Sequence, residues 1–325
     1  MDEHVIEVKD LYVSYDKKRF AVNGISFNVN KGEVFGFLGP NGAGKTTTIR
    51  TLTSVIKPKS GSVKILSMDI MKHSITIKSK IGVILQSSSL ELSLNVEQNL
   101  YLYGYMWNKS RKEITEKVNE LIEKFELDEF RKVQVSELSI GNRRKLQIAR
   151  ELIHDFEILF VDEPTTGLDP VIRKKVLDYF LELKRKGKTI FFTTHQLEDA
   201  DYLCDTVSII NKGKIVINEK KDLLKTRYKN RRKVEILFNK YNERLFDYLK
   251  GIDFIESIKS PENENSFYEL IINDPSKFMD LINSLLREGN ELLWLNIQEA
   301  SLEDIYMDIF GDRYDKDNKN VLQDN

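Results

Sequence analysis

One glycine-rich segment of the sequence combines residue types that can bind phosphate. Residues 39–46 run Gly-Pro-Asn-Gly-Ala-Gly-Lys-Thr and fit the spacing G-x-x-x-x-G-K-[ST]. Glycines permit backbone angles that turn successive N–H groups inward, which makes a concave anion site. Lys45 can reach the β- and γ-phosphates of a nucleotide, and the Thr46 hydroxyl can hold Mg²⁺. The segment therefore predicts a site for nucleotide phosphates.

The elements on either side of this loop suit a phosphate site. Residues 33–38 predict a buried strand, and residues 47–52 predict the opening of a helix. The unpaired N–H groups at the start of that helix, and the positive end of its dipole, would favour an anion. The order of strand, loop and helix is the context in which this motif forms the P-loop of nucleotidases.

A second group of candidate residues follows another apolar strand. Residues 158–161 are Ile-Leu-Phe-Val, and the acidic pair Asp162 and Glu163 comes directly after them. In a P-loop fold this strand lies beside the loop, so Asp162 would hold Mg²⁺ and Glu163 could polarise the attacking water as a general base. Taken alone, the pair also fits a solvated acidic turn.

Composition limits the classes of function. The chain has 325 residues, of which 41% are hydrophobic and 31% charged, with a net charge of −1. The balanced charge gives no support for nucleic-acid binding. The single cysteine, Cys204, cannot form an internal disulfide, which suits a reducing compartment. No run approaches the roughly 20 apolar residues of a membrane span, and residues 1–4 lack signal-peptide features. We expect a cytoplasmic protein.

The hydrophobic pattern predicts an α/β protein. Short strands are expected within residues 4–38, and residues 60–85 are β-rich. Ser110 and Glu113 form a capping box before an amphipathic helix. Strands and helices then alternate from about 142 to 223, which implies a parallel sheet covered by helices. The expected segments are helices near 143–153, 171–186 and 197–203, and strands at 157–161, 189–193 and 206–210.

The pattern changes near a basic run at residues 227–233, which we interpret as a linker. Strands at 234–238 and 267–272 and helices around 242–250 and 276–288 predict a small α+β domain over 225–311. The polar tail 312–325 is expected to be disordered. The predicted organisation is thus a nucleotide-binding domain at 1–224, a small accessory or regulatory domain at 225–311 with no sign of catalysis of its own, and the tail.

Together with the loop and the acidic pair, residues 138–142 point to a family. They read Leu-Ser-Ile-Gly-Asn, followed by a basic helix start and Ile-Ala-Arg-Glu-Leu at 148–152. The chain resembles the ATP-binding subunits of ABC transporters, whose signature is L-S-G-G-Q. Ile140 and Asn142 depart from that signature. Ser139 and Gly141 match it, and the resemblance makes them contacts for a γ-phosphate.

Further positions match this family in order. Gln86 corresponds to the glutamine that senses Mg²⁺ and the membrane partner, residues 167–170 with Asp169 resemble the D-loop, and His195 matches the switch histidine on the γ-phosphate. Tyr15 lies where the family stacks adenine on an aromatic ring, with Tyr12 as the less favoured candidate. The nucleotide-binding residues implied are Tyr15, Gly39, Pro40, Asn41, Gly42, Ala43, Gly44, Lys45, Thr46, Thr47, Ser139, Gly141 and Asp169.

The resemblance, which covers about residues 4–224, implies the remaining features. It implies the P-loop ABC ATPase fold: a parallel-sheet core, an antiparallel β subdomain and a helical subdomain at about 87–155. Glu163, His195 and Gln86 would serve catalysis, and Thr46, Gln86 and Asp162 would serve Mg²⁺. Two copies would pack head to tail around ATP and drive a separate membrane permease from the inner face of the cell membrane.

Two points concern the branch of the family and its membrane partner. Residues 299–306, which include Ser301-Leu302-Glu303-Asp304-Ile305, resemble the ending of the drug and antibiotic exporter branch. Alternatives are a non-transport ABC ATPase, regulatory or ribosome-associated, and a protein with a dead site. The aromatic residues of one stretch fit either core packing of the helical subdomain or docking of the permease: Tyr101, Tyr103, Tyr105 and Trp107.

Overall fold

The computed structural model describes residues 3–15, 19–87, 89–107, 109–227, 231–239, 243–259, 267–287, 290–299 and 301–306. By its internal contacts the chain divides into two compact units, Met1–Lys221 and Asp222–Asn325. The tail that we predict at 312–325 lies outside the described residues. In the described part of the chain, no helix has the length and apolarity needed to cross a membrane.

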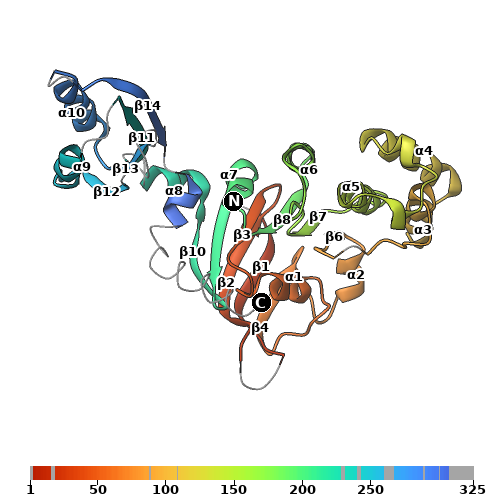
Figure 1. The fold of residues 1–325 in the computed structure, drawn as a ribbon. Helices are drawn as coiled ribbons and strands as arrows, with labels where there is room; N and C mark the ends of the chain where they lie inside the picture. The colour runs from red at the N-terminus through yellow and green to blue at the C-terminus, as the bar shows by residue number, and fades with distance from the viewer. Residues whose placement is uncertain are drawn as a thin grey trace. The chain divides into compact units, whose positions relative to one another are not determined.

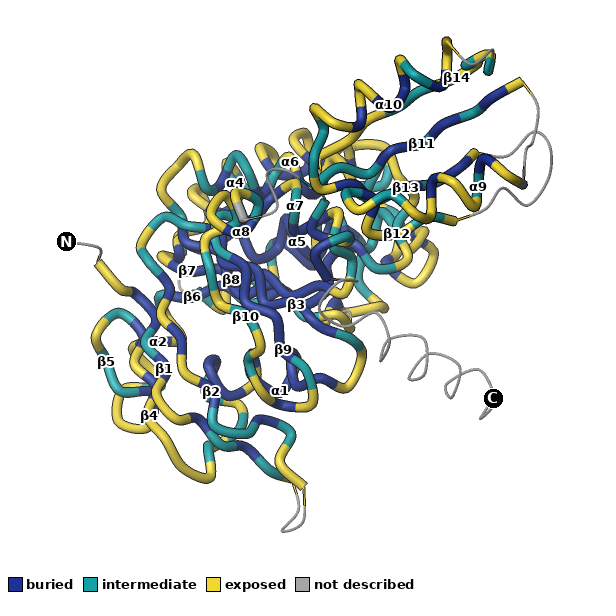
Figure 2. Tube along the Cα trace, turned by 90° about the vertical axis from the view of Figure 1, so that its left-hand side faces the viewer, coloured by how far each residue is buried: buried dark blue, intermediate teal, exposed yellow. Residues whose placement is uncertain are grey.

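A six-stranded sheet forms the centre of the first unit, with the order β10-β9-β3-β8-β7-β6 (Figure 1). Neighbouring strands are parallel, except that β10 is antiparallel to β9. Every residue of β3, β7 and β8 is buried (Figure 2), as expected for strands covered on both faces. The strands are Val34–Leu38 (β3), Ile81–Ile84 (β6), Ile158–Asp162 (β7), Thr189–Thr194 (β8), Thr206–Asn211 (β9) and Lys214–Lys220 (β10).

The strand order brings three candidate segments together. The loop 39–46 follows β3, His195 follows β8, and Asp162 ends β7. Because β3, β8 and β7 are parallel neighbours in that order, their carboxyl ends meet at one edge of the sheet. Open α/β sheets bind ligands at this edge.

The helices next to these strand ends have clear local causes. They are Lys45–Leu52 (α1), Pro170–Arg185 (α6) and Leu197–Leu203 (α7). At the start of α6, Asp169 Oδ1 accepts the N–H groups of Val171 and Ile172, both at 3.0 Å, and Pro170 occupies the first turn. The short helix Ser74–Lys78 (α2) was not predicted within the β-rich segment.

An antiparallel sheet of order β2-β1-β4-β5 packs on the central sheet through aromatic side chains. The ring of Phe27, on β2, stacks on Phe35 with 5.3 Å between centroids and lies 5.9 Å from Phe191. This confirms the predicted antiparallel β subdomain. Its strands are His4–Val13 (β1), Val22–Asn30 (β2), Ser60–Ile65 (β4) and Met68–Asp69 (β5).

The helical subdomain contains α3 (Val96–Met106), α4 (Arg111–Lys124) and α5 (Ile140–Glu151), with 3₁₀ turns at Asp128–Phe130 and Val135–Glu137. The predicted capping box of Ser110 and Glu113 is present at α4. Helix α5 starts earlier than predicted, because Ser139 Oγ accepts the N–H of Asn142 at 3.2 Å and so caps the helix.

The second unit contains an antiparallel sheet of order β12-β13-β11-β14 and two amphipathic helices. Val234, Ile236 and Phe238 alternate along β11 and are buried in its core with residues of α9 and α10. The β-α-β-β-α-β order is that of a ferredoxin-like fold. Its elements are β11 (Arg232–Phe238), α9 (Glu243–Lys250), β12 (Ile255–Lys259), β13 (Tyr268–Ile272), α10 (Pro275–Arg287) and β14 (Leu292–Glu299), with α8 (Lys221–Arg227) at the boundary of the units.

Candidate active site

The glycine-rich loop has the backbone that its sequence predicts. Gly42 and Gly44 have φ angles of 77° and 116°, which favour glycine. A Cβ on Gly44 would lie 2.5 Å from the carbonyl oxygen of Ala21, and one on Gly39 would lie 2.3 Å from that of Ile210. Both positions therefore exclude a larger side chain.

The loop presents N–H groups that can bind an anion. The N–H of Ala43 donates to Pro40 O at 3.2 Å, and that of Thr48 donates to Gly44 O at 2.9 Å. Within the described chain, the N–H groups of Lys45 and Thr46, at the start of α1, have no acceptor. A helix N-terminus of this kind favours a phosphate.

Lys45 is buried, with 5% of its surface exposed. Its ammonium donates to Gly39 O at 2.7 Å and to Pro40 O at 3.1 Å, and it lies 3.0 Å from Glu163 Oε1. Since an ammonium has three donors, these contacts use all of them. The ion pair joins the end of β7 to the loop.

Asp162 is buried between two hydroxyl groups. Its Oδ2 accepts from Thr46 at 2.9 Å, and its Oδ1 accepts from Thr193 at 2.6 Å. A carboxylate beside a hydroxyl at the loop supplies oxygen ligands of the kind Mg²⁺ takes alongside substrate phosphates. The donor set therefore fits Mg²⁺, with Thr46 and Asp162 as the residues that would hold it.

Glu163 has a left-handed backbone, with φ at 46°, and its N–H donates to Thr193 O at 3.1 Å. Its Oε2 lies 2.7 Å from His195 Nδ1 and accepts from the Thr166 hydroxyl at 3.1 Å. Burial raises the pKa of Glu163, but Lys45 and His195 lower it more, so the net shift is downward. The carboxylate is therefore ionised and held at the centre of the site.

Tyr15 lies beside the loop. Its hydroxyl is 3.2 Å from the hydroxyl of Thr47, and 64% of the residue is exposed, so its ring is accessible for stacking. Tyr12, the less favoured candidate, packs edge-on against Phe20 with 5.5 Å between centroids. The geometry thus supports the preference for Tyr15.

The other predicted residues do not join this cluster. Gln86 is exposed, and its side chain has no hydrogen bond to the described residues. Ser139 caps α5, and the nearest atom to a Cβ on Gly141 would be Ile172 Cδ1 on α6, at 2.6 Å. Asp169 caps α6. Within the described chain, none of these four residues makes a hydrogen bond or ion pair with residues 39–46.

The aromatic residues of α3 and Trp107, which follows the helix, differ in their contacts and exposure. Tyr103 donates to Glu151 at 2.8 Å, and Trp107 stacks on His154 with 3.8 Å between centroids. Tyr101 donates to Thr115 at 3.0 Å, whereas Tyr105 is 52% exposed. Tyr101, Tyr103 and Trp107 are half-buried and are held by these contacts within the chain, whereas docking stays a hypothesis for the exposed Tyr105.

Two residues of the site were missed. Thr193 contacts Asp162 and Glu163, and Thr166 contacts Glu163. The polar Thr193 near the end of the apolar strand β8 was the available signal. For Thr166, the sequence carries no signal beyond its place three residues after Glu163.

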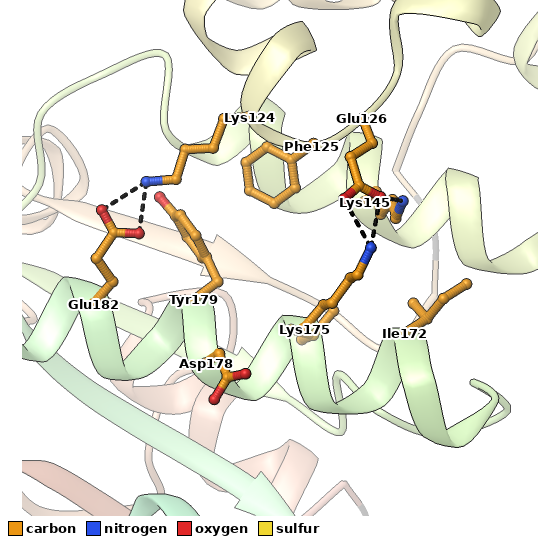
Figure 3. Close-up of a pocket in the computed structure, with 10 residues that line it drawn as sticks. Lys124, Phe125, Glu126, Lys145, Ile172, Lys175, Asp178, Tyr179 and Glu182 are labelled. Carbon is orange, nitrogen blue, oxygen red and sulfur yellow. Dashed lines mark hydrogen bonds and ion pairs between the residues drawn. The ribbon is translucent and has the colours of Figure 1, made fainter.

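A pocket of about 300 Å³ lies between α4, α5 and α6, and none of the predicted site residues line it. Figure 3 shows Lys175 reaching Glu126, at 2.7 Å, and Lys124 reaching Glu182, also at 2.7 Å. These ion pairs and the buried side chains of Phe125 and Val176 join the helical subdomain to α6. The pocket is a packing junction apart from the phosphate loop.

The parallel core, the phosphate loop and the acidic strand end define a P-loop ATPase domain of the ABC class. The family model described as ABC transporter matches residues 22–166. The linearmycin resistance ATP-binding protein LnrL of Bacillus subtilis is 30% identical over 94% of this chain and 98% of its own. The daunorubicin/doxorubicin resistance ATP-binding protein DrrA of Streptomyces peucetius is 32% identical over 94% and 92%.

A solved structure, a dimeric bacterial ABC transporter cassette, matches with a TM-score of 0.62 and 25% identity, over 66% of this chain and 98% of that one. The chain belongs to the ABC transporter family, as an ATP-binding subunit homologous to drug and antibiotic resistance ATP-binding proteins. Its first unit is an ABC ATPase domain.

Proposed function

We propose that the chain binds ATP with Mg²⁺ at the loop 39–46, hydrolyses it, and thereby powers export of a drug, antibiotic or lipid-like molecule by a separate membrane permease. The observation that carries the proposal is the Glu163 carboxylate, which lies between Lys45, at 3.0 Å, and His195, at 2.7 Å. The names of the resistance and export relatives support the exporter branch.

Each residue of the cluster has a role in this proposal. The free N–H groups of α1 hold the phosphates, together with Lys45 once a phosphate oxygen replaces one of its present acceptors. Tyr15 stacks on adenine. Thr46 and Asp162 would hold Mg²⁺, whose charge would offset the negative charge of the phosphates. Glu163 accepts a proton from the attacking water, and His195 holds that carboxylate in place.

The separation of Ser139 and Gly141 from the loop supports a site shared by two copies. In the proposed head-to-tail dimer, these residues of one copy contact the nucleotide on the loop of the other, and Asp169 lies near the junction. ATP then joins the two copies, and hydrolysis releases them. A dimeric cassette among the solved structures supports the pairing of two copies.

The remaining assignments concern the surroundings of the site. Gln86 and the exposed Tyr105 are proposed to face the permease, which would hold the chain at the inner face of the membrane. We assign the ferredoxin-like unit, like the predicted domain 225–311, an accessory role in bracing or regulating the dimer, since the described residues of its core are hydrophobic side chains.

The experiment is ATP turnover by the Glu163→Gln variant. Loss of a positioned general base lowers turnover by about 100- to 10,000-fold, while ATP binding is retained. The matched control is Glu157→Gln, which lies before the same strand and pairs with Lys80 at the surface, so its turnover should be unchanged. Undiminished hydrolysis by Glu163→Gln would overturn the role of Glu163.

A further inference from the structure

A single buried guanidinium joins three separate segments of the ATPase domain. Arg144 lies on α5, five residues after its Ser139 cap, and is 7% exposed. Its Nη1 donates to Leu85 O at 2.9 Å, and its Nη2 donates to Gln86 O at 3.3 Å and to Glu163 O at 3.4 Å. The helix that begins at the signature residues is thus tied to the segment of Gln86 and to the end of β7.

Burial of the Arg144 guanidinium costs desolvation free energy. Among the described residues, no carboxylate lies within ion-pair distance of Arg144, and its fourth hydrogen bond goes to Gln147 Oε1 at 2.9 Å. Burial lowers the pKa of Arg144, and the charge of Asp162 opposes that shift. An apolar side chain would fill the same space without desolvating a charge. The hydrogen bonds of the guanidinium therefore explain the presence of an arginine at position 144 better than a contribution to folding stability does.

The backbone of Glu163 needs outside support. A non-glycine residue at a φ of 46° is strained, and such strain persists only where neighbours hold the backbone in place. Thr193 O accepts the N–H of Glu163, and Arg144 donates to its carbonyl oxygen. These contacts fix both ends of the residue that carries the proposed general base.

We propose that Arg144 is a positioning residue for ATP hydrolysis. Its guanidinium binds the backbone carbonyls of Gln86 and Glu163 and thereby fixes the position of both residues relative to α5, the helix that begins at Ser139 and Gly141. The inference rests on the proposed function, because Arg144 acts through Glu163. A lysine keeps the charge but cannot donate from a planar fork to several carbonyls, so the planar group is the essential feature.

The test compares Arg144→Lys with Arg150→Lys in the full chain. Arg150 is the matched control, because it lies on the same helix, is 8% exposed, and donates to Ser89 O and Oγ without touching Gln86 or Glu163. Steady-state turnover, ATP affinity and the melting temperature are measured for each. Misplacement of a catalytic group lowers kcat by about 100-fold in Arg144→Lys, with ATP affinity unchanged because Arg144 does not contact residues 39–46. Arg150→Lys keeps the kcat of the unaltered chain.

Several results would overturn the proposal. An unchanged kcat in Arg144→Lys would do so, as would an equal fall of kcat in Arg150→Lys. Loss of ATP binding by Arg144→Lys would show a general structural role instead. The Glu163→Gln variant, measured in parallel, separates the two hypotheses. Full ATP turnover by Glu163→Gln would contradict the proposed function. Loss of turnover in Glu163→Gln together with full turnover in Arg144→Lys would contradict this inference alone.

Discussion

The buried carboxylate of Asp199 offers a quantitative test of how the site is supported. Asp199 lies on α7 and is 1% exposed. It accepts hydrogen bonds from the Thr165 hydroxyl and from Arg173 Nε, the latter at 2.6 Å. It therefore links α7 and α6 to the turn that follows Glu163.

The magnitude for Asp199→Ala follows from these contacts. A hydrogen bond to a charged group contributes about 1.5–3 kcal/mol, and the variant loses two of them. The side chain of Arg173 is 25% exposed, so water replaces part of the loss. We expect the free energy of unfolding to fall by about 3 kcal/mol. For a unit of this size, the melting temperature should fall by roughly 6–12 °C.

The assay is urea unfolding followed by tryptophan fluorescence. The chain has two tryptophans, so a Trp294→Phe background leaves Trp107 as the reporter of the first unit. Glu198→Ala is the matched control, since Glu198 contacts the same Arg173 at 3.0 Å but is 76% exposed. An exposed ion pair contributes less than about 1 kcal/mol. A loss for Asp199→Ala within 1 kcal/mol of the control would refute the reasoning.

Three further predictions concern the nucleotide site. In a binding titration, Tyr15→Ala should weaken ATP binding about tenfold, because the base loses its stacking partner. Tyr15→Phe loses only the contact with Thr47 and should bind ATP within about threefold of the unaltered chain. Equal weakening by the two variants would contradict stacking on Tyr15. Thr46→Ala should weaken ATP binding in Mg²⁺ but not in EDTA, and equal weakening in both would exclude the metal role. Because Lys45 and His195 hold the pKa of Glu163 below its ordinary 4.5 despite burial, its ionised form stabilises the fold above that pH. That stability is lost as pH falls through the lowered pKa. The difference in unfolding free energy between the unaltered chain and Glu163→Gln should thus narrow only below about pH 4.5, and a difference independent of pH would contradict the pairing.

The sequence predicted the parts of the fold whose patterns are local. Strands β3, β7 and β8 are continuous apolar runs, and the loop at 39–46 has a fixed spacing, so each was found within a residue or two of its bounds. Their parallel order then brought Asp162, Glu163 and His195 to the loop. Local pattern and topology together were enough for the core of the site.

Features that depend on distant contacts were not predictable in this way. Helix α3 was missed because its tyrosines and exposed apolar residues lack a clear amphipathic stripe, and β14 was missed for a similar reason, with Leu293 and Trp294 both exposed. The role of Arg144 depends on carbonyl groups 58 and 19 residues away in the chain. Every residue has a backbone carbonyl, so the residue type does not indicate which carbonyl accepts a hydrogen bond. Such a contact is found only in the structure.

The most direct test of the central claim, that two copies share each ATP, is the molar mass of Glu163→Gln in Mg²⁺ and ATP by light scattering. The account predicts twice the 37.9 kDa of one chain with ATP, and a single chain without it. Adding Ser139→Arg should prevent the dimer while ATP still binds each chain, because the second face of the site is then blocked. A Glu163→Gln chain that binds ATP yet stays single, or a dimer that persists with Ser139→Arg, would contradict the shared site.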